Sequence, residues 1–136
     1  MGPRARESLM ALDILILTER ISEDALERLV RGSFGDMVKY VVDIERGAIA
    51  IGGELHADAE QALLEWGSRG PSLWGANYYP GLGRENCIEF TSLINIRPAQ
   101  LNPDMGVRDP AIRERIRALT FALLGEGEPL GKGEPG

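Results

Sequence analysis

The sequence predicts an α+β fold: a mainly antiparallel sheet of about five strands with three helices, in the order βαββαββα. Two observations support this prediction. Apolar and polar residues alternate on both sides of a glycine turn at Gly47, which is typical of a β-hairpin. Three other stretches begin with a helix-capping residue and carry apolar residues at helical spacing. A chain of 136 residues is long enough for one domain with one core.

Composition narrows the class of protein. Hydrophobic residues make up 43% and charged residues 26%, as in an ordinary soluble globular protein. No apolar run reaches the length of a membrane span. The single cysteine, Cys87, excludes an internal disulfide and favours a reducing cytoplasm. The net charge of −6 argues against non-specific nucleic-acid binding.

The two ends of the chain differ from its middle. Residues 1–9 are polar without periodicity and are expected to form a flexible N-terminal extension. Residues 10–124 are expected to form a single α+β domain. Residues 125–136 are rich in Gly, Glu and Pro, and we expect them to be disordered. Residues 126–136 should be removable with almost no loss of stability.

The first strand and helix follow from local signals. The apolar run Leu12 to Leu17 predicts a buried strand. Ser22 is the expected N-cap of a helix with acidic residues in its first turn, and Gly32 is expected to end it.

The hairpin that follows has a definite predicted register. A two-residue turn at Arg46-Gly47 places Ile44 opposite Ile49 and Val42 opposite Ile51. One face then collects apolar residues (Val38, Tyr40, Val42, Ile44, Ile49, Ile51 and Leu55). The other face collects polar residues around small ones (Lys39, Asp43, Glu45, Glu54 and His56 around Ala48, Ala50 and Gly52).

The second half predicts a helix, two strands and a last helix. Asp58 is the expected N-cap of the second helix, and Leu73 to Tyr79 reads as a strand. Cys87 to Arg97 is the longest predicted strand, ended by Pro98. Asp109 caps the last helix, with Pro110 at its first position. We expect four side chains to be fully buried: Leu26, Ile51, Ile116 and Leu119.

Four segments together resemble a known family: residues 34–39, 42–45, 51–58 and 94–98. They are similar to a prokaryotic family of small proteins catalogued only as a domain of unknown function. The resemblance covers about Leu12 to Leu124. It implies one soluble cytoplasmic domain and brings no activity, cofactor or site residue with it.

A metal site is one hypothesis for the hairpin. Glu54, His56 and Asp58 alternate, so on an extended strand their side chains leave the same face and would suit a divalent ion. The structural alternative is that Asp58 caps the helix, Glu54 faces Lys39 and His56 is a polar surface or core residue.

A ligand site is the main hypothesis for function. Arg97 offers a planar fork for a carboxylate or phosphate, and Asn95 lies on the same predicted strand face. With Asp43, Glu54 and His56 these residues would form a polar site for a small ligand or anion. If the site were hydrolytic, His56 or Glu54 would be the base. A structural ion pair of Arg97 with one of the acids is the alternative.

A homodimeric interaction module without catalytic activity is the second functional hypothesis. Small residues in a strand usually allow another element to approach closely, so Ala48, Ala50 and Gly52 would accept a helix or a second subunit. The last helix is the other expected contact.

Overall fold

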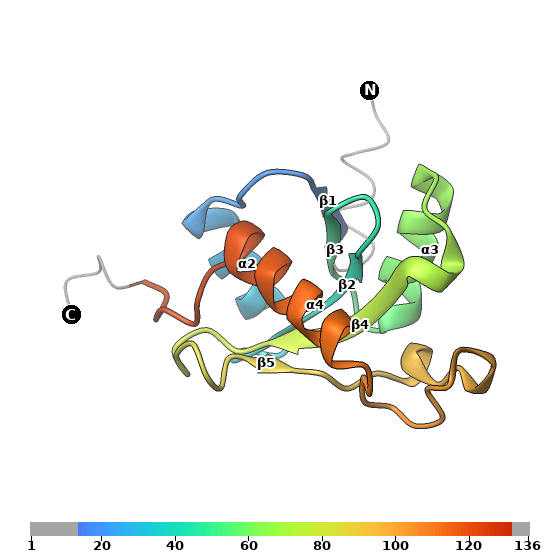
Figure 1. The fold of residues 1–136 in the computed structure, drawn as a ribbon. Coiled ribbons are helices and arrows are strands. Elements are labelled where there is room, and N and C mark those ends of the chain that lie inside the picture. Colours follow the sequence, from blue (N-terminus) through green and yellow to red (C-terminus); the bar gives the residue numbers. More distant parts are fainter. Residues whose placement is uncertain (1–13, 132–136) are drawn as a thin grey trace.

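The computed structural model describes residues 14–131 and contains one five-stranded antiparallel sheet with three helices (Figure 1). The sheet order is β1-β3-β2-β4-β5. The predicted α+β class and element order are confirmed. The strands are β1 (Ile14–Leu17), β2 (Val38–Asp43), β3 (Ala48–Gly52), β4 (Leu73–Tyr78) and β5 (Ile88–Glu89), and the helices are α2 (Glu23–Gly32), α3 (His56–Trp66) and α4 (Pro110–Leu123). The predicted extension at residues 1–9 lies outside the described residues.

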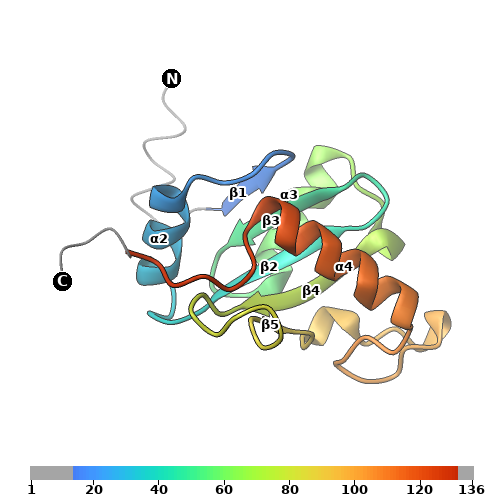
Figure 2. The same ribbon diagram turned by 60° about the vertical axis from the view of Figure 1, so that its left-hand side comes forward.

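Helices cover both faces of the sheet (Figures 1 and 2). Helices α2 and α4 pack on the face that carries Tyr40, Val42 and Ile51, and form the larger apolar core. Helix α3 packs on the opposite face against Val41 and Ala50. The four residues predicted to be buried are all in the larger core: Leu26, Ile51, Ile116 and Leu119. In the part of the chain described, no helix is long and apolar enough to cross a membrane.

The capping predictions for α2 and α4 are confirmed. The Ser22 hydroxyl accepts the Ala25 N–H at 3.1 Å, and Asp109 accepts the Ala111 N–H at 2.8 Å. The expected end of this helix at Gly32 is confirmed, but Gly32 is not the glycine in the left-handed conformation. Gly32 is the last helical residue, and Gly35 takes the left-handed conformation (φ +90°) and donates its N–H to the Val30 carbonyl.

The β2–β3 hairpin differs from its predicted register. Val42 lies opposite Ile49 and Tyr40 opposite Ile51, so the loop has four residues, 44–47, instead of two. The Asp43 carboxylate explains the longer loop, because Oδ1 accepts the N–H groups of Glu45 and Arg46, both at 2.9 Å. The shift is two residues, and side chains alternate with a period of two, so the predicted faces of both strands survive.

Helix α3 begins earlier than predicted, and it covers the small-residue face. Its first residue is His56, and Asp58 lies in its first turn, where it accepts the Leu55 N–H at 3.3 Å. Asp58 is therefore not the N-cap. Ala50 packs against Ala59 and Leu63, so a helix of the same chain uses the close approach that the small residues permit.

The predicted long strand Cys87–Arg97 is wrong beyond Glu89. The chain leaves the sheet after β5 and forms two short 3₁₀ turns, η2 (Leu93–Asn95) and η3 (Pro98–Gln100). The Ser92 hydroxyl accepts the Ile94 N–H at 3.2 Å and starts the first of these turns. Serine side chains compete in this way with strand pairing, which explains the early end of the strand.

The segment after α4 also differs from expectation, because residues 125–131 are docked on the domain. We call them the C-terminal strap. The Gly127 carbonyl accepts the N–H groups of Gly81 at 2.9 Å and Gly83 at 3.0 Å, and the Gly127 N–H is donated to the Tyr78 hydroxyl at 2.9 Å. Arg84 pairs with Glu126 at 2.6 Å. Residues 132–136 of the predicted tail lie outside the described residues.

Candidate functional site

Asp43, the first predicted ligand-binding residue, is completely buried and holds the hairpin loop. Besides the two loop N–H groups, its carboxylate accepts the Ser68 hydroxyl at 2.5 Å. The carboxylate therefore links the β2–β3 loop to the end of α3. These three hydrogen bonds point to a structural role.

Asn95 is also completely buried, and its amide completes the edge of β4. The side-chain oxygen accepts the Gly75 N–H at 2.9 Å, and the side-chain nitrogen donates to the carbonyls of Gly75 and Met105, both at 3.0 Å. Asn102 supports the same turn, because its amide donates to the Asn95 carbonyl at 2.7 Å. The amide of Asn95 thus replaces the strand pairing that β5 does not continue.

Arg97 links the η2 turn to the start of β4 through hydrogen bonds. Its guanidinium donates to the carbonyl oxygens of Ile94 (3.0 Å), Pro71 (3.4 Å) and Leu73, and lies 4.7 Å from the centre of the Trp74 ring. Burial lowers the pKa of Arg97, and the Glu60 carboxylate at 3.9 Å acts in the opposite direction. Its acidic neighbour comes from α3 and is neither Asp43 nor Glu54.

The alternation of Glu54, His56 and Asp58 is interrupted because α3 starts at His56. Glu54 is exposed, whereas His56 is 8% exposed and its Nε2 lies 2.8 Å from the Ala76 carbonyl oxygen. Residues 14–131 contain no group of three acidic, histidine or cysteine side chains placed to hold a metal ion. Of the predicted site residues, His56 and Asn95 are brought together at Gly75. A Cβ at Gly75 would lie 3.2 Å from His56 Cδ2.

A polar cluster does form beside His56, and three of its members were not predicted as site residues. Lys39 on β2 pairs with Asn77 on β4, and Asn77 pairs with Glu89 on β5. Directly paired residues of an antiparallel sheet project from the same face, so these side chains form one row across three strands. We call Lys39, His56, Asn77 and Glu89 the polar sheet site.

Asn77 is the centre of this site. It is 6% exposed, and its Nδ2 donates to Glu89 Oε1 at 2.8 Å. Its Oδ1 is buried and has no hydrogen-bond partner among the described atoms. Tyr79 donates its hydroxyl to the same Glu89 oxygen at 3.1 Å. A buried acceptor without a partner is costly, so this oxygen marks where a donor group would bind.

The electrostatics of the site favour a neutral imidazole. Burial is the main cause that lowers the pKa of His56, and the Lys39 ammonium acts in the same direction. The hydrogen bond to the Ala76 carbonyl, the nearby Asn77 side chain and the Glu89 carboxylate all oppose this shift. With Nε2–H donated to that carbonyl, Nδ1 is left as an acceptor. Burial and the Glu89 carboxylate raise the pKa of Tyr79, so its phenol remains a donor.

Sequence reasoning missed Asn77 and Glu89 because their positions depend on strand pairing. A signal was present: Asn77 is an amide inside a strand that is otherwise Leu, Trp, Gly, Ala and Tyr. Its importance emerges only when the register sets it between Lys39 and Glu89, and the predicted long strand beginning at Cys87 did not provide that register.

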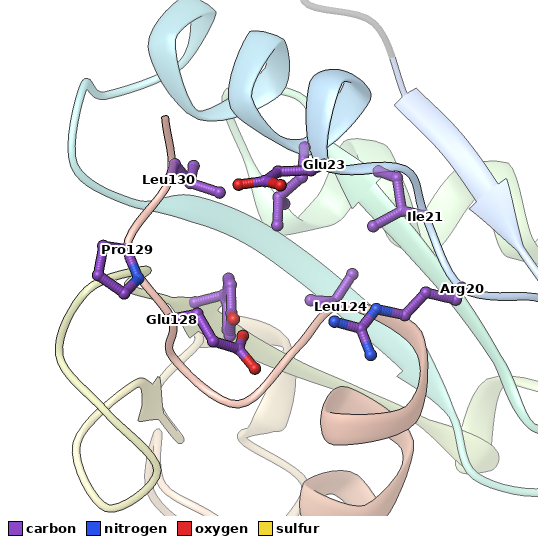
Figure 3. Close-up of a pocket in the computed structure, with 9 residues that line it drawn as sticks. Arg20, Ile21, Glu23, Leu124, Glu128, Pro129 and Leu130 are labelled. Carbon is purple, nitrogen blue, oxygen red and sulfur yellow. The ribbon is translucent and has the colours of Figure 1, made fainter. Parts of the chain in front are cut away.

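A separate cavity of about 240 Å³ lies between the start of α2 and the C-terminal strap (Figure 3). Arg20, Glu23 and Glu128 supply its charged rim. The Tyr78 hydroxyl also faces it but already accepts the Gly127 N–H, and burial raises the pKa of Tyr78 to about 12. The remaining lining is apolar (Ile21, Leu26, Leu124, Pro129 and Leu130). This cavity is a consequence of strap docking, and its tyrosine serves that docking.

The fold and the site define a small α+β protein with an antiparallel sheet covered by helices on both faces and a row of polar side chains across β2, β4 and β5. Residues 15–123 match the family described as protein of unknown function (DUF5674), and the chain belongs to that family. This match confirms the resemblance to an uncharacterised family. Searches of curated proteins and of solved structures found no match.

Proposed function

We propose that this protein binds a small polar ligand with an anionic group at the polar sheet site. The observation that carries the proposal is the buried, unpaired Oδ1 of Asn77, set between a cationic and an anionic side chain. A binding residue whose polar atom is satisfied only in the complex has this property, because the ligand supplies the missing donor.

Each side chain has a distinct role in the proposal. Asn77 Oδ1 and His56 Nδ1 accept hydrogen bonds from hydroxyl or amino groups of the ligand. The Lys39 ammonium binds its carboxylate or phosphate. Glu89 orients Asn77 through the 2.8 Å hydrogen bond. Hydroxy acids and amino acids combine these groups and are the ligand classes we favour. The cytoplasmic location predicted from Cys87 suits such metabolites and stays a prediction.

The test is a ligand panel of small hydroxy acids, amino acids and phosphates, read by thermal unfolding and by amide shifts in NMR. A ligand that prefers the native state raises the melting temperature by linkage. Asn77→Val and Lys39→Gln should lose this rise. Arg28→Gln removes a charge from the exposed side of α2 and should keep it.

The unfolding stability of Asn77→Val without ligand shows whether a lost ligand response reflects lost binding or lost folding. Asn77→Val relieves the cost of the unpaired acceptor but also removes the 2.8 Å hydrogen bond to the exposed Glu89 carboxylate. The variant should therefore remain folded and lose no more than about 1–2 kcal/mol of unfolding free energy. The proposal is contradicted if no ligand class shifts the wild type, or if a ligand shifts wild type and Asn77→Val equally.

A further inference from the structure

The outer edge of β1 is an apolar strand edge without charge. Strand β1 consists of Ile14, Leu15, Ile16 and Leu17, and it pairs within the sheet only with β3. Its other edge has no strand partner in the part of the chain that is described. Natural proteins usually protect such an edge with lysine, proline, a bulge or very short length. Strand β1 is short, with four residues, but residues 14–17 contain no lysine or proline, and their pairing with β3 is continuous, without a bulge.

The opposite edge of the sheet is protected. Strand β5 has two residues, after which the chain turns away from the sheet into η2. Its exposed residue, Glu89, is charged. Strands β1 and β5 form the two opposite edges of the sheet (Figure 2). The β5 edge therefore resists pairing, whereas the β1 edge favours it.

Leu15 shows which face of β1 lacks a cover. It pairs with Ile51, so its side chain projects toward the α2 and α4 face, yet it is 38% exposed. Ile14 and Ile16 project to the other face and pack against the α3 core. Leu17, on the same face as Leu15, packs on the larger core. The uncovered apolar surface of the edge is therefore centred on Leu15.

We propose that β1 pairs with β1 of a second copy of this chain, in an antiparallel arrangement that joins two sheets into one of ten strands. The proposal concerns assembly and goes beyond ligand binding at the polar sheet site. Two copies with a net charge of −6 each repel one another, so they should meet where neither presents a charge. The edge of β1 is such a place.

Symmetry restricts the register of this pairing. Directly opposed residues of an antiparallel pair share a face, and a two-fold axis perpendicular to the sheet keeps that face. Leu15 can therefore lie opposite Leu15 of the second copy, or Ile16 opposite Ile16, but Leu15 cannot lie opposite Ile16. We favour the register centred on Leu15, because it buries the exposed leucine of both copies against each other.

The oligomeric state of the full chain tests the proposal, measured by analytical ultracentrifugation over a range of concentrations. The wild type should show a concentration-dependent dimer. Leu15→Lys sets two ammonium groups opposite each other and should weaken the dimer at least about ten-fold. Leu82→Lys is the matched control, since Leu82 is an exposed leucine (54%) in the turn that precedes β5. It should leave the dimer unchanged.

Cross-linking then tests the register. The sole native cysteine, Cys87, is fully buried, so an added cysteine reports on the interface alone. Under oxidation by copper phenanthroline, Leu15→Cys should form a disulfide between copies, whereas Thr18→Cys, just beyond the strand, should not. A wild type that stays monomeric at all concentrations overturns the proposal. So does a Leu15→Lys variant that dimerises as the wild type does. Equal cross-linking at positions 15 and 18 overturns the register.

Discussion

Asn95 provides the sharpest test of the difference between a ligand-binding and a structural side chain. Its amide satisfies three backbone groups: the N–H and carbonyl of Gly75 and the carbonyl of Met105. Asn95→Ala leaves all three without this partner in a site that solvent does not reach. At a net value of about 1 kcal/mol per hydrogen bond, the variant should lose about 3 kcal/mol of unfolding free energy.

Asn95→Asp refines the test because it nearly preserves the shape of the side chain. The new carboxylate still accepts the Gly75 N–H, but it places negative charge against two carbonyl oxygens. Burial should raise the pKa of this carboxyl above the usual value of about 3.9. A group with a raised pKa stabilises the fold at low pH, and that stabilisation is lost as pH rises through the folded-state pKa. The variant should therefore lose more stability at pH 7 than at pH 4, relative to the wild type.

Urea denaturation followed by the fluorescence of buried Trp74 measures both effects, with the m-value as a check on two-state behaviour. Asn86→Ala is the control, because Asn86 is exposed, and it should change stability by less than about 0.5 kcal/mol. If Asn95→Ala comes within about 1 kcal/mol of the wild type, the structural assignment is refuted, and ligand binding by Asn95 becomes the better hypothesis.

Three further predictions follow from buried groups and close backbone contacts. Tyr40→Phe removes the 2.6 Å hydrogen bond between the Tyr40 hydroxyl and Thr120 and should lower the unfolding free energy by about 1 kcal/mol. A double-mutant cycle with Thr120→Val should show coupling between the two residues. Additive effects would contradict the contact. The pKa of His56, the sole histidine, is lowered in the folded state, so the unfolded chain binds a proton more readily and stability should fall as pH drops below about 6.5. His56→Gln should reduce this dependence of stability on pH. An unchanged pH dependence would assign it to carboxylates. Gly127→Ala should destabilise the protein by about 1–3 kcal/mol, because φ at Gly127 is +82° and the new Cβ would lie 2.6 Å from the Gly83 backbone. Gly32→Ala is the control, since its new Cβ would meet no atom within 4 Å, and this variant should stabilise α2. Equal denaturation midpoints for the two variants would contradict strap docking.

Local and periodic signals were sufficient for the elements and their faces. The α+β class, the element order and the capping of α2 by Ser22 and α4 by Asp109 could be predicted from the sequence. Each depends on residues a few positions apart. The division of hairpin side chains between two faces was also predictable, and it survived a wrong register because an error of two residues leaves the alternation unchanged.

The candidate site could not be predicted in the same way, because its polar side chains form hydrogen bonds with residues that are distant in the sequence. Asp43 and Asn95 hydrogen-bond to backbone groups that packing brings near, and their ligand-binding role stays a prediction. The strap was missed because its stability comes from backbone contact between two glycines 44 positions apart, Gly83 and Gly127, which composition does not reveal.

The sequence by itself determined which residues form strands and helices and which faces are apolar, since both follow from spacing along the chain. Tertiary structure alone decided that Lys39, Asn77 and Glu89 form one row, and that β1 lies at an edge of the sheet within residues 14–131. The physical reason is that strand order and register are set by the sum of many distant contacts. No short segment contains that sum.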